Sequence, residues 1–339
     1  MSPQIDAVLP FWFDRPDNEA LDIAHEVRAA GLDTLWIGEM ATFDAFALAT
    51  AVGLRVPELR LKIGPLAIGV RTPVSMALAA ASVTALTGCQ VSLALGASSP
   101  AIVSGWHGRE WAHSGSRMRE TVGALRPILA GERSSFEGSY VRTHGFRLRP
   151  PQPQLRISVA AFGPAMMRVA ARLADEVVLN LVSPQHVSAV RAVIDLEAAA
   201  AGRNPPDLAV WVPAALDPGD RARAQISAQL AMYLAAPGYG EMFSTLGFSE
   251  LVGRARSGVS RSELASSIPT ELLQQICALG SDQDVTGRIS EYFQAGADIV
   301  GIAPSTAEDP GGRAVLSAIA TILREPPVSP PASKETQAS

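Results

Sequence analysis

The sequence predicts an α/β protein folded as a single (β/α)8 TIM barrel, with insertions before the fifth and the eighth strands. Three observations support this prediction. Short apolar runs alternate with amphipathic stretches along the chain, glycine often closes the amphipathic stretches, and proline often opens them. The length of 339 residues and the hydrophobic content of 47% suit one barrel with a large core.

Eight short apolar runs are the predicted parallel strands, because strands buried on both faces are nearly continuous in hydrophobic residues. They are Ala7–Phe13, Thr34–Gly38, Leu61–Ile68, Val91–Gly96, Arg156–Ala161, Glu176–Leu181, Leu208–Pro213 and Asp298–Ala303. The stretches between them are predicted crossover helices. Examples are Asn18–Ala30, Phe46–Val56, Pro73–Thr87, Arg117–Ala130, Pro164–Leu173 and Pro184–Ala201.

The boundary residues support the order of strand followed by helix. Gly31, Gly88 and Gly296 each separate a predicted helix from the next strand, where glycine tolerates the left-handed conformation that ends a helix. After four strands, a capping residue followed by proline marks a helix start. These steps are Thr72-Pro73, Ser99-Pro100, Gly163-Pro164 and Ser183-Pro184. They lie at the edge of the barrel where enzymes of this fold place their active sites.

Two regions interrupt the alternation. Ser134–Pro153 alternates like a β-hairpin and precedes the fifth strand, and Asp217–Pro269 contains helical runs and precedes the eighth. Insertions of this length are more often functional than passive, so we expect 217–269 to form a lid or wall over the pocket. We assign residues 1–325 to one catalytic domain and 326–339, rich in proline and serine, to a disordered tail.

Composition argues against several classes of partner. The formal charge of −5 gives no reason to expect nucleic-acid binding, which is indicated by a clustered basic face. No apolar run is long enough to span a membrane. The N-terminus lacks the basic region of a signal peptide, so we expect a cytoplasmic protein. Cys89 and Cys277 are far apart in apolar settings and are interpreted as buried structural thiols.

Several common catalytic motifs are absent from the sequence. The five histidines show no metal-ligand spacing, so no metal site is expected. The GxSxG nucleophile motif, the Walker A loop and the GxGxxG dinucleotide motif are also missing, which argues against common hydrolases and Rossmann-type NAD binding.

The remaining candidates are small residues at strand ends. Gly96, Ala97, Ser98 and Ser99 follow the fourth strand, where small side chains let the backbone approach a flat ring and hydroxyls can donate hydrogen bonds to it. The segment Phe162, Gly163, Pro164, Ala165 and Met166 follows the fifth strand. It places unpaired amides at a helix N-terminus, which is a favourable phosphate site, although it can equally be only a helix start.

Glu39 follows the second strand directly, at the predicted active-site edge. It is either an exposed loop carboxylate or a pocket carboxylate that contacts cofactor or substrate.

The segments that carry these candidates resemble the luciferase-like monooxygenase superfamily, in particular its actinobacterial coenzyme F420-dependent oxidoreductases. They are LWIGEMATFDAFALAT, LKIGPLAIGVRTP, ALTGCQVSLALGASSPAIVSGWHGREW, RMRETVGALRPILAGE and VAAFGPAMMRVAARLADEVVLN. The segments AMYLAAPGYGEMF and GSDQDVTGRISEYFQAGAD also look like that branch, and the similarity runs from about Asp6 to Leu323.

The resemblance implies a cofactor ring across the strand ends, with its phosphate on Gly163, Pro164, Ala165 and Met166. It implies that residues 96–99 flank the ring. It also implies a non-prolyl cis peptide bulge behind the ring, near Leu66-Ala67, and a homodimer. Several members carry Asp-His after the second strand, whereas this chain has Glu39-Met40. Methionine cannot transfer a proton, so His107 becomes the replacement candidate beside Glu39.

The predicted function is hydride transfer between C5 of reduced coenzyme F420 and an electrophilic carbon of a small organic substrate. Trp106, His107, Phe43 and the second insertion are the expected substrate wall. One alternative is an FMN-dependent monooxygenase on the same fold, and a second is a member without catalytic activity that binds cofactor or nothing.

Overall fold

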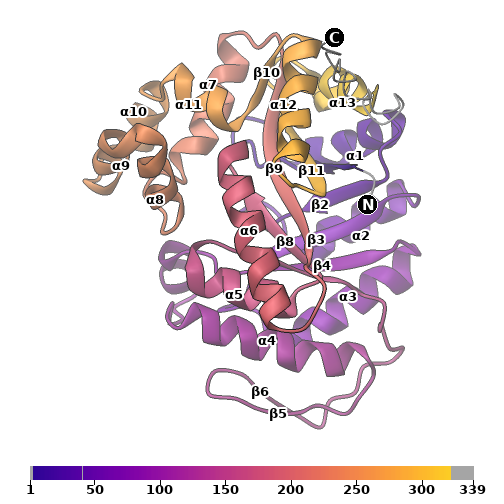
Figure 1. Cartoon of the computed structure of the whole chain (residues 1–339). Helices are drawn as coiled ribbons and strands as arrows, with labels where there is room; N and C mark the ends of the chain where they lie inside the picture. The colour runs from indigo at the N-terminus through magenta and orange to yellow at the C-terminus, as the bar shows by residue number, and fades with distance from the viewer. Residues whose placement is uncertain (1–2, 40, 322–339) are drawn as a thin grey trace, which may run out of the picture.

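The computed structural model describes residues 3–39 and 41–321 and confirms the (β/α)8 barrel (Figure 1). Eight parallel strands pair in the order β1-β2-β3-β4-β7-β8-β9-β11, and β11 returns to β1 to close the sheet. Their bounds are β1 Gln4–Val8, β2 Thr34–Ile37, β3 Arg60–Ala67, β4 Val91–Gly96, β7 Ile157–Ala160, β8 Glu176–Asn180, β9 Asp207–Leu216 and β11 Ile299–Pro304.

Helices cover the outside of the barrel (Figure 1). They are α1 Glu19–Ala29, α2 Ala45–Arg55, α3 Pro73–Thr87, α4 Ser114–Leu129, α5 Gly163–Leu173, α6 Pro184–Ala200, α12 Asp282–Gln294 and α13 Arg313–Ala320, with short turns η1 Ala101–Trp106 and η3 Pro310–Gly312. The bounds of α3 are as predicted, because the Thr72 side chain caps its first turn and Gly88 ends it in the left-handed conformation.

The first strand was predicted too late in the chain. It spans Gln4–Val8 instead of Ala7–Phe13. Pairing with β2 ends at Val8, the amide of Leu9 still reaches Trp36 O at 2.9 Å, and Pro10 has no N–H to continue the ladder. Residues 9–13 therefore lie beyond the strand end, on the side of the barrel where the site is expected.

The segment before the fifth barrel strand contains a two-stranded hairpin, β5 Ser135–Glu137 and β6 Arg142–His144. The Glu120 carboxylate of α4 accepts hydrogen bonds from the backbone N–H groups of Ser139, Tyr140 and Val141 at 3.1, 2.7 and 3.0 Å. Burial opposes ionisation of this carboxyl, but the three donors outweigh it and lower its pKa. The hairpin is thus fixed to the outer face of α4.

The second interruption is helical, with α7 Asp220–Ala231, α8 Tyr239–Phe243, η2 Ser244–Phe248, α9 Ser249–Arg256 and α10 Arg261–Ser266. These helices project from one side of the barrel (Figure 1). They are followed by α11 Thr270–Ile276 and by β10 Ala278–Gly280, which pairs with β9 outside the closed ring. A three-residue strand has too little pattern to be predicted from sequence.

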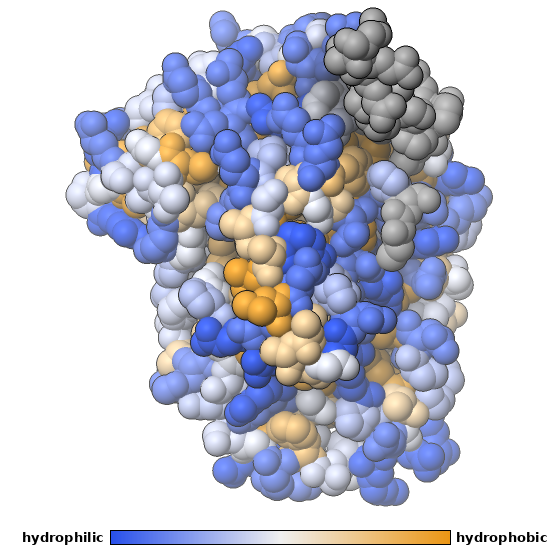
Figure 2. All heavy atoms as spheres, in the orientation of Figure 1, coloured by the Kyte–Doolittle hydropathy of each residue, from blue (hydrophilic) through white to orange (hydrophobic). Residues whose placement is uncertain are grey.

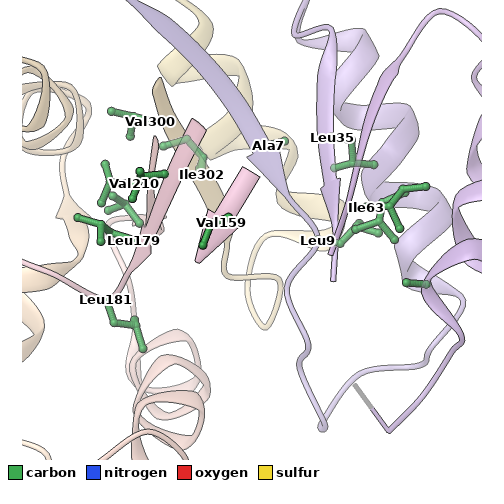
Figure 3. Close-up of a cluster of buried hydrophobic side chains, with 14 of the residues drawn as sticks. Ala7, Leu9, Leu35, Ile63, Val159, Leu179, Leu181, Val210, Val300 and Ile302 are labelled. Carbon is green, nitrogen blue, oxygen red and sulfur yellow. The ribbon is translucent and has the colours of Figure 1, made fainter. Parts of the chain in front are cut away.

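The main hydrophobic core lies between the strands and the helical shell. Figure 3 labels residues from seven strands of this layer, including Ala7, Leu35, Ile63, Val159 and Val210. A smaller apolar cluster fills the inside of the barrel around Trp36, whose ring meets Trp211 edge-on at 5.2 Å. Both faces of the sheet are therefore packed, as the apolar runs predicted.

Next to Trp36, the inside of the barrel holds a buried network of charged side chains. Lys62 Nζ lies 3.0 Å from Asp6 Oδ2 and 2.7 Å from Glu176 Oε2. Trp36 Nε1 donates to Asp6 at 2.8 Å, and the Ser158 hydroxyl donates to Glu176 at 2.8 Å. Burial favours the uncharged form of Lys62, but the two carboxylates outweigh it and raise the pKa of Lys62.

Within the described residues, no helix is both long and apolar enough to cross a membrane. Cys89 and Cys277 are buried and unbridged, and burial raises the pKa of the Cys277 thiol to about 12. A thiol that stays protonated is a poor nucleophile, in agreement with the structural role predicted for it.

Candidate functional site

Five strand residues toward the carboxyl ends of the barrel strands are partly solvent-accessible, namely Pro65, Ala67, Ala160, Asn180 and Trp211. Ala160 and Trp211 also pack against the interior cluster. We call the surface formed by these five residues the barrel mouth.

Two glycines allow close packing at this edge of the barrel. A Cβ added to Gly96 would lie 3.0 Å from Pro65 Cβ, and one added to Gly38 would lie 2.7 Å from the Phe11 ring. Larger side chains at these two positions would collide with Pro65 and Phe11. The approach of a flat ring to residues 96–99 stays a prediction.

The irregular end of β3 differs from the expectation. The register between β3 and β4 shifts between Ile63 and Leu66. The non-prolyl cis bond expected near Leu66-Ala67 is absent, and the cis bond here is the prolyl bond Gly64-Pro65. Proline lowers the preference for the trans isomer, which a non-prolyl bond retains. Leu66 packs outward in the main core, so Pro65 and Ala67 face the mouth in its place.

The loop after β4 is held by its own neighbours. Trp111 Nε1 donates to the carbonyls of Ala97 and Ser98 at 3.1 and 3.2 Å. The Ser99 carbonyl accepts a hydrogen bond from the Val103 amide at 2.9 Å, at the start of η1. Ser98, in contrast, is exposed. Of the two predicted hydroxyls, Ser98 is therefore the more available to a ligand.

The N-terminus of α5 lacks an internal cap. Thr72 and Ser183 cap α3 and α6 with their side chains, but the corresponding residue of α5 is Phe162, which has no acceptor. The amides of Gly163 and Ala165 belong to the first turn and have no intrahelical acceptor, and Gly163, Pro164 and Ala165 are exposed. This end of α5 presents unpaired donors and the positive end of a helix dipole, which suits a phosphate.

Glu39 does not stand alone after β2. Arg71 forms an ion pair with Glu39, with its Nε 3.0 Å from Glu39 Oε2, and a second ion pair with Asp44. The Arg71 guanidinium also lies 5.1 Å from the centre of the Phe46 ring. Glu39 is thus a fixed carboxylate beside a cation. Met40, at the position where several relatives carry histidine, lies outside the described residues.

The remaining predicted residues lie on loops. His107 follows η1, is exposed, and makes no side-chain hydrogen bond to another described residue. Trp106 and Phe43 have exposed fractions of 57% and 39%. These residues follow β4 and β2, so they belong to the same edge of the barrel as the mouth.

Sequence reasoning missed a polar and aromatic cluster formed by Asn180, Tyr233, Tyr239 and Phe162. The Asn180 amide donates to the Tyr239 hydroxyl at 3.2 Å, and the Tyr239 ring lies 4.3 Å from Phe162 and 4.8 Å from Tyr233. The segment containing both tyrosines was noted as part of the second insertion and of the family resemblance, but neither tyrosine was named as a site residue. No sequence signal connects Tyr239 to Asn180, 59 residues earlier.

Gly238 allows this contact. It adopts φ +86°, and a Cβ at this position would lie 2.7 Å from Phe162 Cβ. The second insertion thus rests directly on the residue that precedes the α5 N-terminus.

The described residues contain no group of three or more His, Cys, Asp or Glu arranged to hold a metal ion. A surface hollow of about 490 Å³ lies outside the barrel beside α1 and η3. Two of its acidic side chains are engaged, Glu19 by Arg15 and Glu26 by Arg313. The mouth, with its unpaired amides, is the better candidate site.

Comparison with known proteins places the chain in a family. A Mycobacterium tuberculosis protein provisionally named as a coenzyme F420-dependent oxidoreductase is 25% identical over 329 residues, covering 88% of this chain and 94% of that protein. The 5,10-methylenetetrahydromethanopterin reductase of Archaeoglobus fulgidus is 26% identical, covering 83% and 89%. The solved F420-dependent tetrahydromethanopterin reductase of Methanopyrus kandleri superposes with a TM-score of 0.77 at 16% identity, covering 94% and 97%.

A second solved structure, an F420-dependent secondary alcohol dehydrogenase, superposes with a TM-score of 0.76 at 16% identity, covering 94% of this chain and 99% of that chain. Residues 14–298 match the luciferase-like monooxygenase family over most of the barrel. The chain therefore belongs to the luciferase-like monooxygenase family.

Proposed function

We propose that this protein is a coenzyme F420-dependent oxidoreductase acting on a small organic substrate. The observation that carries the proposal is the uncapped N-terminus of α5 beside the partly accessible strand ends of the barrel mouth, because it offers donors for a phosphate. The names of the relatives that match most of the chain support the choice of F420.

The residues present fit such a cofactor. The exposed Ser98 hydroxyl would face the ring, and the amides of Ala165 and Met166 would hold the phosphate. When bound, the reduced deazaflavin supplies a hydride from C5 to an electrophilic substrate carbon and is oxidised, while a proton completes the product. The chain orients the ring and closes the site against water.

Two residues are proposed to act near the reacting atoms. Glu39 is held by Arg71 in a fixed position after β2, where it would orient a polar group of cofactor or substrate. His107 is exposed on the loop after η1 and would exchange a proton with solvent. Trp106, Phe43 and the second insertion are proposed to wall the substrate.

FMN is the alternative cofactor, because a family fold of this kind also occurs in a monooxygenase solved with FMN, with a TM-score of 0.67. Equilibrium binding of F420 and FMN to the apo-protein, followed by fluorescence quenching, separates the two. We expect F420 to bind with a micromolar or lower Kd. Binding of FMN alone would instead favour oxygen-dependent chemistry, and binding of neither would favour a member without catalytic activity.

Replacing Ala165 by glutamate should weaken F420 binding at least ~10-fold, because a carboxylate would face the phosphate at the α5 N-terminus. The neutral variant Ala165→Gln is the matched control and should lose much less affinity. Folding should not suffer, since acidic residues stabilise a helix N-terminus. Equal losses in both variants would argue that the phosphate binds elsewhere.

We also propose a homodimer that associates through α2 and α3. The 15 residues of α3 include no charged side chain, yet Leu78 and Leu86 are exposed, and so is Leu54 of the adjacent α2. Figure 2 shows another apolar patch over α6, where Val193 and Leu196 are exposed, but that helix also carries charged residues such as Arg191 and Asp195.

Light scattering coupled to size exclusion tests this assignment. Leu78→Glu should convert the dimer to a monomer, because it places a charge in an uncharged interface. Leu196→Glu is the matched control and should remain dimeric. The reverse pattern would place the contact on α6.

A further inference from the structure

We propose that Asn180, Tyr233 and Tyr239 form a subsite for the oxygen of a neutral carbonyl substrate. The three side chains meet where the second insertion reaches the end of β8. The identity of the hydride donor rests on the proposed function, but the recognition of a neutral oxygen rests only on these side chains.

The first argument is unsatisfied hydrogen-bonding capacity. The Asn180 amide donates to Tyr239 Oη at 3.2 Å. Among the described residues, neither the Tyr233 hydroxyl nor the Asn180 side-chain oxygen has a hydrogen-bond partner with good geometry, and neither atom is sealed from solvent. Polar groups in such a setting are expected to find a partner, which here must be water or a ligand.

The second argument is protonation. Burial raises the pKa of both Tyr233 and Tyr239, although the nearby Asn180 amide opposes the shift. Both hydroxyls therefore keep their protons across the physiological range and can donate hydrogen bonds. A donor that faces a carbonyl oxygen gains strength as negative charge develops on that oxygen.

The third argument is the absence of a free cation in the cluster. Both arginines of α9 are already paired, Arg256 with Glu241 and Arg254 with Glu263. Across the mouth, Arg71 is engaged by Glu39 and Asp44. These paired arginines favour an uncharged carbonyl, which needs only the hydroxyls, over a phosphate or carboxylate substrate.

The fourth argument is the apolar surround. Tyr239 packs on Phe162 at 4.3 Å and lies 6.3 Å from Phe243, and the accessible ring of Trp211 bounds the mouth on the neighbouring β9. Aromatic walls with a few polar atoms are typical of small-molecule sites and favour a substrate with a hydrocarbon body. The substrate class is therefore a neutral ketone or aldehyde, or the corresponding alcohol in the reverse direction.

The test uses cyclohexanone as the probe and isothermal titration calorimetry as the readout, with the full-length protein both alone and with oxidised F420. Tyr233→Phe should weaken cyclohexanone binding about 3- to 10-fold, the loss of one hydrogen bond. The same variant should bind methylenecyclohexane, which has the same shape but no oxygen, as the parent protein does. Tyr140→Phe, on the hairpin outside the mouth, is the matched control and should change neither affinity.

Separate outcomes distinguish this proposal from the proposed function. If Tyr233→Phe lowers F420 affinity and leaves cyclohexanone binding unchanged, the cluster holds cofactor and the proposal is overturned. Tighter binding of glucose 6-phosphate than of cyclohexanone would also overturn it. If the parent protein binds no F420 but Tyr233→Phe still selectively weakens cyclohexanone binding, the subsite stands and the cofactor assignment fails.

Discussion

Lys62→Met is expected to lower the free energy of unfolding by about 3–5 kcal/mol, the usual cost of removing one partner from a buried ion pair. Lys62 is the only cation in contact with Asp6 and Glu176 among the described residues, and all three side chains are largely buried inside the barrel. Methionine fills a similar volume, so the loss comes from two unpaired carboxyl groups and not from a cavity.

The pH dependence gives a specific signature. Burial already raises the pKa of Glu176 in the native protein, and loss of Lys62 should raise the pKa of Glu176 further. A group whose folded pKa exceeds its unfolded pKa destabilises the fold as pH rises through that range. The deficit of Lys62→Met should therefore be larger at pH 8 than at pH 5, measured by urea unfolding at both values.

The double variant Lys62→Met, Glu176→Gln is the matched control, because it removes one of the two carboxylates together with the cation. It should recover part of the lost stability at pH 8. A deficit independent of pH would contradict the electrostatic explanation and indicate altered packing instead.

Gln225→Leu is expected to destabilise the protein by about 2–4 kcal/mol, since unsatisfied buried polar groups each cost roughly 1–3 kcal/mol. Gln225 lies buried in α7, and its side-chain oxygen accepts from Ser305 Oγ at 2.8 Å and from the amides of Thr306 and Ala307 at 2.9 and 3.2 Å. Its amide donates to Asp14 at 3.0 Å. One side chain thus ties the second insertion to the loops after β1 and β11.

Thermal unfolding compared with Gln229→Leu measures this effect. Gln229 lies one turn further along α7 and makes no side-chain hydrogen bond to another described residue, so its replacement should change stability by less than ~0.5 kcal/mol. Hydrogen exchange should also show faster opening of the loop at 305–307 in Gln225→Leu. Equal effects of the two substitutions would mean that the network around Gln225 adds no stability.

Much of the fold follows from local patterns. Apolar runs separated by amphipathic stretches require parallel strands covered on both faces, and eight such units close into a barrel. The bounds of α3 could be predicted because Thr72, Pro73 and Gly88 act within one turn of the helix ends. The start of α5 was predicted one residue too late, because Gly163 was expected as the capping residue, whereas Phe162 is the N-cap and has no acceptor.

The candidate site was predicted only in part. The glycine and small residues after β4 were found because residue size is visible in the sequence. The orientation of the Leu66 side chain could not be predicted. A register shift in β3 turns Pro65 and Ala67, and not Leu66, toward the mouth. The ion-pair partner of Glu39 could not be predicted either, because Arg71 comes from the end of another strand, 32 residues later in the chain.

The sequence by itself therefore determined the barrel, its insertions and the edge that carries the site, because strand period, helix caps and residue size act over a few residues. Only the tertiary structure decided which distant side chains meet. Lys62 contacts Glu176 across 114 residues, and Asn180 contacts Tyr239 across 59. The physical reason is that such contacts depend on how the barrel closes and how the second insertion packs on it. Neither of these produces a periodic pattern in the sequence.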